Sequence, residues 1–205
     1  MLISGTHAAK ARYRMTTRLI LGISGNVRRP SRTASLVADV TGRLADRVGA
    51  PSRLIELVDA APVLFRALTA AHLDEEGAAL VKAVETADAL VVGSPVYRAS
   101  YTGALKHLFD LVGYEALAGK PVVLVATGGT PLHGLVPDHQ LRPLFAFFRS
   151  LVLPTPLYAL DTDFTNYVVT SSAVEARLER VVDEARRVIE GAWRGEEALL
   201  AGAAA

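Results

Sequence analysis

Short runs of consecutive apolar residues recur along the chain, and amphipathic segments separate them. The runs have the length and the Val, Ile and Leu content of β-strands, and they occupy residues 19–23, 53–57, 89–93, 121–126 and 156–160. Apolar residues at helical spacing predict helices at residues 33–48, 75–87, 103–112, 137–151 and 174–193. Strands that alternate with helices predict an α/β protein with an open, doubly wound parallel sheet and helices on both faces.

Polar loops rich in Gly, Ser and Thr follow three of the predicted strands. They span Ser24–Ser31, Ser94–Tyr101 and Thr127–Leu135. Right-handed crossovers place the carboxyl ends of parallel strands at one edge of the sheet, and ligands bind there, where the strand order reverses. We therefore expect the three loops to meet at this edge and to form one binding site.

The first loop has the composition of an anion site. Arg28 and Arg32 supply positive charge, Ser31, Thr33 and Ser35 supply hydroxyl donors, and a helix N-terminus follows directly. The alternative is that Ser31 only caps the helix and that the arginines are solvated. The loop has neither the G-x-x-x-x-G-K-[ST] pattern nor G-x-G-x-x-G, which disfavours a nucleoside triphosphatase or an ordinary dinucleotide-binding domain.

The other two loops have residues suited to a planar ring. Pro95 fixes the backbone after its strand, Tyr97 offers an aromatic face, and Thr102 or the nearby Ser100 can cap the next helix. Gly128 and its neighbour Gly129 would expose backbone N–H groups. The alternative is that the tyrosines pack under a turn and that the glycines only permit one. Together the three loops favour a ligand with a phosphate at one end and a planar heterocycle at the other, which is the shape of flavin mononucleotide (FMN).

Composition narrows the function classes. The 205 residues are 51% apolar with a net charge of +1, so nothing favours nucleic acid or a membrane surface as a partner. There is no cysteine, which excludes disulfides, thiol catalysis and thiolate metal sites and fits a cytoplasmic protein. The histidines are scattered without metal-ligand spacing, so we expect no metal. We expect residues 1–17 to be a disordered basic extension, residues 18–195 the FMN-binding domain, and residues 196–205 a flexible tail.

Three motifs in this order resemble the NAD(P)H-dependent FMN reductases of flavodoxin-like fold. The segment Gly25–Ser35 is similar to their G-S-x-R-x-x-S phosphate loop, Ser94–Lys106 to their P-x-Y…G-x-L-K segment, and Ala126–His133 is the third. The resemblance runs from about Arg18 to beyond Phe164 and is greatest to reductases that feed two-component alkanesulfonate and methanesulfonate monooxygenases. In one departure, Asn26 stands where the family usually has Ser, and its amide can still bond a phosphate.

The resemblance implies a five-stranded sheet of order 2-1-3-4-5 and a set of binding residues. The residues that would hold the FMN phosphate are Gly25, Asn26, Arg28, Ser31, Thr33 and Ser35. Those that would line the ribityl chain and the isoalloxazine are Pro95, Val96, Tyr97 and Arg98. Those that would contact the ring are Thr127, Gly128, Gly129 and Thr130. No catalytic acid is required, because hydride transfer is the chemistry of the flavin and the nicotinamide.

The interpretation of His139 comes from the sulfonate-linked members of this family. There the equivalent helix carries an inserted Tyr or His in a π-bulge, near the flavin and at a subunit interface, and such bulges mark functional sites. We expect a π-bulge at His139; the alternative is an exposed histidine at a helix start.

The resemblance also implies partners and leaves alternatives open. FMN would be a substrate that leaves as FMNH2 for a monooxygenase, met in transient contact, and the protein would be a homodimer or homotetramer. The coenzyme is NADH or NADPH, and Arg29, Arg66 and Arg98 are candidates for a 2′-phosphate site. The alternatives are a quinone or azo reductase that retains FMN and a flavodoxin-type electron carrier, although the near-neutral charge speaks against the carrier.

Overall fold

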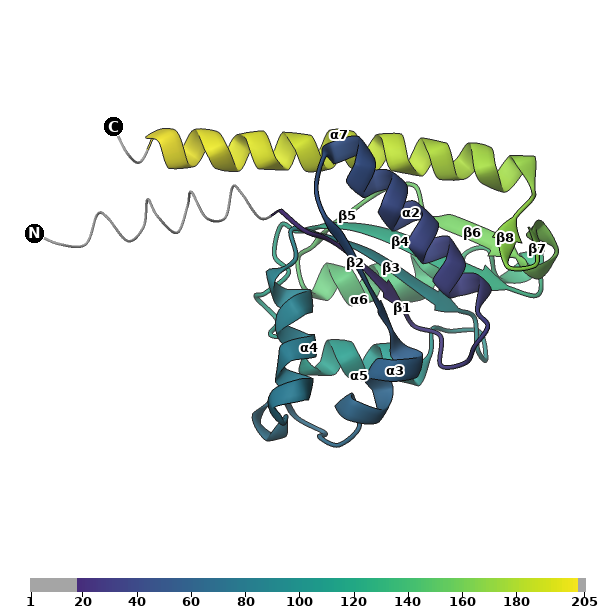
Figure 1. Ribbon diagram of the computed structural model, residues 1–205, viewed down its shortest axis with the longest axis horizontal. Helices are drawn as coiled ribbons and strands as arrows, with labels where there is room; N and C mark the ends of the chain where they lie inside the picture. The colour runs from purple at the N-terminus through teal and green to yellow at the C-terminus, as the bar shows by residue number, and fades with distance from the viewer. Residues whose placement is uncertain (1–17, 203–205) are drawn as a thin grey trace, which may run out of the picture.

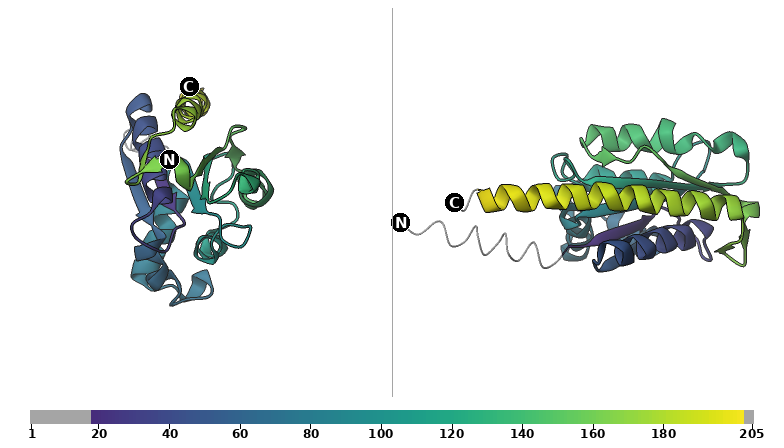
Figure 2. Two further views of the ribbon diagram at one scale, coloured as in Figure 1. Left: turned by 90° about the vertical axis from the view of Figure 1, so that its right-hand side faces the viewer. Right: turned by 90° about the horizontal axis from the view of Figure 1, so that it is seen from above.

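The computed structural model describes residues 18–202, which form a parallel sheet between two layers of helices (Figure 1, Figure 2). The strands of the sheet are β1 (Ile20–Ser24), β2 (Ser52–Glu56), β3 (Ala89–Pro95), β4 (Pro121–Gly128), β5 (Leu151–Val152) and β6 (Leu157–Leu160). The order is β2-β1-β3-β4-β5, with β6 also beside β4, and every pairing is parallel. The predicted 2-1-3-4-5 order of the flavodoxin-like fold is confirmed.

Two short strands share the fifth position in the sheet. β5 pairs with the start of β4, at Pro121 and Val122, and β6 pairs with its end, from Val125 to Gly128. Pro154 and Pro156 lie between β5 and β6, and neither has an N–H for the ladder. This explains why the edge strand is interrupted and why the sequence predicts only its second half.

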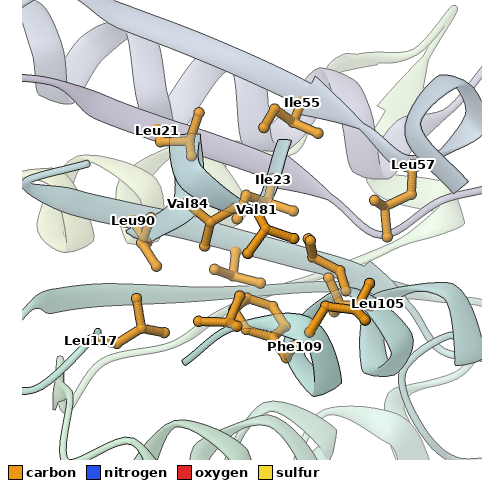
Figure 3. Close-up of a cluster of buried hydrophobic side chains, with 14 of the residues drawn as sticks. Leu21, Ile23, Ile55, Leu57, Val81, Val84, Leu90, Leu105, Phe109 and Leu117 are labelled. Atoms are coloured by element: carbon orange, nitrogen blue, oxygen red, sulfur yellow. The ribbon is translucent and has the colours of Figure 1, made fainter. Parts of the chain in front are cut away.

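Each face of the sheet has its own core. On one face, Ile20, Val91 and Val123 pack under α2 (Arg32–Val48) and α7 (Ser172–Gly202). On the other, Leu21, Leu90 and Leu124 pack against helices α3 (Leu57–Leu64), α4 (Glu75–Thr86), α5 (Gly103–Leu111) and α6 (Arg142–Phe147). Figure 3 shows this second core, where side chains from the strands meet Leu105 and Phe109 of α5. Apolar side chains thus point alternately to the two faces of each central strand.

Two glycines let α2 approach the sheet closely. A Cβ at Gly93 would lie 2.3 Å from Cγ2 of Val37, and a Cβ at Gly22 would lie 2.6 Å from Oγ1 of Thr41. The close approach brings the N-terminus of α2 directly over the carboxyl ends of β1 and β3. The first loop is therefore held against the sheet edge by packing as well as by its own hydrogen bonds.

Several elements differ from the sequence prediction. The segment predicted as one helix over 137–151 is a π-helix, η3 (Pro137–Leu141), followed by α6; the chain then turns through Arg149, at φ 55°, into β5. Helix α3 was predicted as a loop because its sequence contains Pro62 and has no polar face. Short elements that were not predicted are the 3-10 helices η1 (Ala70–His72), η2 (Pro131–His133) and η4 (Asp161–Asp163) and the hairpin of β7 (Phe164–Thr165) and β8 (Val168–Val169).

The C-terminal helix is longer than predicted. It continues to Gly202, so residues 196–202 of the segment predicted as a tail are helical. Arg18 explains the extension, because its guanidinium pairs with Glu196 at 2.9 Å and lies 4.7 Å from the ring centroid of Trp193. In Figure 1 this end of α7 projects beyond the sheet. The predicted extension over residues 1–17 lies outside the described residues.

Candidate functional site

The three loops meet at the carboxyl edge of the sheet, as the sequence predicts. The N–H of Gly25 donates to the carbonyl of Gly93 at 2.7 Å, which joins the first loop to β3, the strand that leads into the second loop. The N–H of Val96 donates to the carbonyl of Thr127 at 2.8 Å, and the hydroxyls of Thr33 and Thr127 are 2.6 Å apart. The three loops are thus one hydrogen-bonded unit.

The first loop ends in a capped helix N-terminus. Ser31 is the N-cap of α2, and its hydroxyl oxygen accepts from the N–H of Ala34 at 3.1 Å. Ser35 donates its hydroxyl to the carbonyl of Ser31 at 3.2 Å, and Thr33 is buried against Thr127. The capping role of Ser31 is therefore real, yet its hydroxyl proton remains available, since a serine hydroxyl is both acceptor and donor.

The arginines of this loop differ in their partners. Arg29 is bound by carboxylates, at 2.7 Å from Glu56 and 2.6 Å from Asp59, and this pairing holds the pKa of Asp59 below its ordinary value. Arg32 lies 3.6 Å from Asp161. Arg28 is exposed and has no ion-pair partner within residues 18–202. Arg28 therefore supplies the uncompensated positive charge of the loop.

Asn26 is buried beside Arg28 and is 7% exposed. Its amide nitrogen donates to the carbonyl of Arg28, and its carbonyl oxygen accepts from the hydroxyl of Tyr97 at 3.2 Å. The side chain thus connects the first loop to the second, an arrangement that the sequence did not predict because the two residues are far apart in the chain.

The second loop makes a tight turn that presents Tyr97 and Arg98. Backbone hydrogen bonds of 2.8 and 3.1 Å close the turn between Tyr97 and Ser100, and Arg98 and Ala99 have φ values of 52° and 63°. Two successive non-glycine residues in the left-handed region are strained, and such strain clusters at ligand sites. Thr102 caps α5, as predicted, and also donates its hydroxyl to the carbonyl of Gly25 at 2.6 Å.

The third loop lies against Tyr158, a residue that sequence reasoning missed. A Cβ on Gly128 would lie 2.5 Å from the hydroxyl oxygen of Tyr158, so any side chain there would force Tyr158 to shift. The same hydroxyl donates to the carbonyl of Thr130 at 2.7 Å. Burial, together with the charge of Asp161, raises the pKa of Tyr158, so the phenol stays protonated and keeps this bond. Gly129 is exposed. Tyr158 was missed because it lies inside a strand rather than in a loop.

A π-helix is present where the sequence predicts a π-bulge. It spans Pro137–Leu141 and places His139 on an exposed turn. Its neighbour Gln140 accepts a hydrogen bond from the hydroxyl of Ser100 at 3.1 Å, so the π-helix contacts the second loop. The π-helix therefore belongs to the same region of the molecule as the three loops.

A groove of about 500 Å³ runs beside the first two loops. Its walls are mainly apolar and include Val27, Pro62, Phe65 and Tyr97. Phe65 is 53% exposed and stacks on His107, with ring centroids 4.5 Å apart. The groove gives the edge an apolar wall next to its polar loops, as a ligand with both a phosphate and a ring requires.

The donor set fits a phosphate ester. The hydroxyl of Ser24, at the carboxyl end of β1, is fully buried and has no hydrogen-bond partner in the part of the chain that the structure describes. A buried hydroxyl of this kind is expected to find its partner in a ligand or a water. The loop that follows Ser24 adds Arg28 and leads into the N-terminus of α2, so the edge offers charge, hydroxyls and backbone N–H groups for an anion.

Other functions find less support in the described residues. Within residues 18–202 no group of three or more His, Asp or Glu side chains is placed to hold a metal ion. In the same range no helix is both long and apolar enough to cross a bilayer. Of the three arginines considered for a 2′-phosphate, Arg29 is paired as described, and Arg66 is paired with Asp74 and Glu76 at 3.0 and 3.1 Å. Arg98 has no ion-pair partner within residues 18–202.

Comparison with known proteins agrees with the geometry. Residues 18–165 match the family model of NADPH-dependent FMN reductases. The chain is 46% identical over 166 residues to the NADH-dependent FMN reductase SfnF of Pseudomonas fluorescens, covering 81% of this chain and 89% of that protein. It is 44% identical over 172 residues to an FMN reductase (NADPH) of Pseudomonas aeruginosa, covering 84% and 92%. The apo form of the NADH:FMN oxidoreductase EmoB is similar in structure, with a TM-score of 0.75, 32% identity and coverage of 83% and 89%. The chain belongs to the NADPH-dependent FMN reductase family.

Proposed function

We propose that this protein takes FMN as a substrate, reduces it with NADH or NADPH, and releases FMNH2 to a flavin-dependent monooxygenase. The family to which the chain belongs fixes the reaction class as FMN reduction by a nicotinamide coenzyme. The observation that carries the placement of the substrate is the uncompensated charge of Arg28, in the loop that joins β1 to the N-terminus of α2.

The proposed site runs along the edge of the sheet. The phosphate would lie on the first loop, where Arg28 and Ser31 would donate to it together with the backbone N–H groups of the first turn of α2. The ribityl chain and one side of the ring would lie along residues 95–98, and the ring would reach residues 127–130. The apolar groove between Val27 and Tyr97 borders the first two loops and is completed by residues of α3 and the start of α5.

The chain contributes position and electrostatics to the reaction. FMN, when bound, supplies the ring that accepts a hydride from the nicotinamide. The loops would hold the two reactants close together, which would remove much of the entropic part of the barrier. The exposed backbone around Gly129 supplies N–H dipoles to the negative charge that grows on the ring, and the rigid Tyr158–Thr130 bond fixes that backbone. No side chain is required to transfer a proton in the hydride step.

The proposed partner is a two-component monooxygenase of sulfonate metabolism. The support is the resemblance of the three motifs to reductases of such systems. The exposure of the second loop, where Tyr97 is 41% exposed, fits a flavin that enters and leaves. We further propose that the protein is a homodimer or homotetramer and that the π-helix with His139 lies near the flavin at a subunit interface. The contact between Gln140 and Ser100 of the second loop supports the position of the π-helix near the flavin.

The test is NADH and NADPH oxidation by the purified protein, with and without added FMN, together with quantification of flavin bound to the same sample. We expect little bound flavin and turnover that saturates with added FMN. Tightly bound flavin, with turnover of quinones or azo dyes that does not depend on added FMN, would contradict the proposal and assign a reductase that retains FMN.

A further inference from the structure

Asn26 is the one position of the phosphate loop that departs from the family motif, and its side chain is committed elsewhere. The carbonyl oxygen accepts from the hydroxyl of Tyr97, and one amide hydrogen goes to the carbonyl of Arg28. With the side chain only 7% exposed, little of the amide remains for a ligand. The contacts that the structure gives Asn26 are thus to the protein itself rather than to an open anion site.

The contact of Asn26 joins two segments that are 71 residues apart in sequence. Two other hydrogen bonds link the same loops, from the N–H of Gly25 to Gly93 and from the hydroxyl of Thr102 to the carbonyl of Gly25. Both of those involve the backbone at the base of the loops. The bond between Asn26 and Tyr97 is the link that fixes an exposed aromatic side chain.

We propose that Asn26 is a positioning residue that orients Tyr97 toward the flavin ring and is not a ligand of the phosphate. The inference rests on the proposed function, since it requires a flavin along these loops. A serine at position 26 carries its oxygen directly on Cβ, one carbon short of the amide oxygen of Asn26, so it cannot reach the hydroxyl of Tyr97 in this backbone geometry. The departure from the motif therefore adds a contact that the usual serine lacks.

The proposal predicts a dependence on substrate that separates ring positioning from phosphate binding. Riboflavin is FMN without the phosphate. If Asn26 acts through Tyr97, loss of their hydrogen bond weakens the binding of both flavins by the same factor. If Asn26 binds the phosphate, loss of the Asn26 side chain weakens the binding of FMN alone. Arg28 is a proposed phosphate ligand, so its substitution shows what a loss of affinity confined to FMN looks like.

The experiment measures KM and kcat for FMN and for riboflavin in Asn26→Ser, Tyr97→Phe, the double variant and Arg28→Ala. We expect Asn26→Ser and Tyr97→Phe each to raise KM for both flavins by the same factor, about three- to tenfold, as for one neutral hydrogen bond. KM in the double variant should be no higher than in either single variant, because all three variants lack the same hydrogen bond. Arg28→Ala should raise KM for FMN only.

Tyr101→Phe is the matched control, since Tyr101 is in the same loop and its hydroxyl has no hydrogen bond within residues 18–202. We expect unchanged KM values for it. A KM increase confined to FMN in Asn26→Ser, or additive effects in the double variant, overturns the inference while leaving the proposed function intact. Unchanged FMN kinetics in Arg28→Ala as well would instead refute the proposed site. Tyr97→Phe alters an exposed side chain, so it provides the same comparison between flavins if Asn26→Ser does not fold.

Discussion

The arginines on the outer face of α2 and those of the site loops have opposite surroundings. Arg43 lies 2.7 Å from Asp39 of α2 and 2.6 Å from Glu179 of α7, and Arg47 is paired with Glu179 at 2.6 Å and with Asp183, both of α7. Arg28 and Arg98, at the carboxyl edge of the sheet, have no such partner within residues 18–202. Arginine is thus neutralised at Arg43 and Arg47, where it joins two helices, and left uncompensated at Arg28 and Arg98, although Arg29 of the first loop is paired with Glu56 and Asp59.

This difference in partners separates arginines that stabilise the fold from arginines that are available to a ligand. Carboxylate partners satisfy Arg43 and Arg47 within the fold, so these side chains stabilise the packing of α7 on α2 and have no charge left for a ligand. Under the proposed function, Arg28 and Arg98 would contribute little to folding, and their charge would raise the affinity of the edge for phosphate groups. Substitutions in the two regions should therefore affect different measurements.

The largest effect is expected for Arg28→Ala. The loss of a charge-assisted hydrogen bond to the phosphate costs about 1.5–3 kcal/mol, so KM for FMN should rise about 10- to 100-fold. Because Arg28 has no partner in the fold, the midpoint of thermal unfolding should stay unchanged. Steady-state kinetics and a thermal melt on one preparation check both parts. A variant with a lower midpoint and an unaltered KM would reverse the roles assigned to the two regions.

A change of packing at the edge should have the next largest effect. In Gly128→Ala, the new Cβ meets the hydroxyl oxygen of Tyr158 at 2.5 Å, and overpacking of this kind costs about 1–3 kcal/mol. Removal of that hydroxyl in Gly128→Ala/Tyr158→Phe leaves the nearest ring atom at 3.4 Å, an ordinary contact. We expect the double variant to recover stability in urea-induced unfolding relative to Gly128→Ala. No recovery would mean that the backbone of the third loop, and not Tyr158, sets the requirement for glycine.

Arg43→Ala tests the other region. Its partners are half exposed, so the loss of the network should lower the free energy of unfolding by about 1 kcal/mol, or the midpoint by about 3 °C, without a change in KM. Arg43 and Arg47 hold the pKa of Glu179 below its ordinary value of 4.5. A lowered pKa in the folded state stabilises the protein above the unfolded value, and this stabilisation is lost as the pH falls through the folded value.

The stability difference between wild type and Arg43→Ala should therefore be full at neutral pH and shrink below about pH 4.5. Denaturant titrations at several pH values measure it, with Lys82→Ala, on the opposite helical layer, as the control. A difference that grows on acidification would show that Arg43 does not stabilise α7 through these carboxylates.

The smallest effect is expected for Arg98→Ala. An exposed ion pair is worth about 0.2–1 kcal/mol, so removal of a contact with the 2′-phosphate should raise KM for NADPH up to about fivefold and leave KM for NADH unchanged. Arg66→Ala is the control, because Asp74 and Glu76 already occupy its guanidinium. Equal effects of Arg98→Ala on both coenzymes would assign Arg98 to the flavin side of the site instead.

The sequence was informative about the fold where local pattern decides structure. The apolar runs of β1, β3 and β4 are buried on both faces, so their composition alone identifies them. Helix α3, with Pro62 inside it, forms because neighbouring elements bury it, and the partly exposed two-residue strand β5 forms by pairing with β4. Nothing in their own spacing predicts them.

The candidate site also has features that local sequence predicts and features that it does not. The glycines, the Ser31 cap and the loop order follow from strand ends and turn residues, which local sequence specifies. The Asn26–Tyr97 bond and the contact of Tyr158 with Thr130 join residues that are 71 and 28 positions apart. The pairing of Arg29 with Asp59, which removes one cation from the site, likewise depends on how α3 packs. These contacts needed the three-dimensional structure.

The most direct test of the central claim, that the uncompensated edge recognises the phosphate of FMN, is an equilibrium titration of wild-type protein with FMN and with riboflavin, followed by flavin fluorescence. The account predicts that FMN binds at least about tenfold more tightly than riboflavin and that added salt narrows the difference. Equal affinity for the two flavins would contradict it.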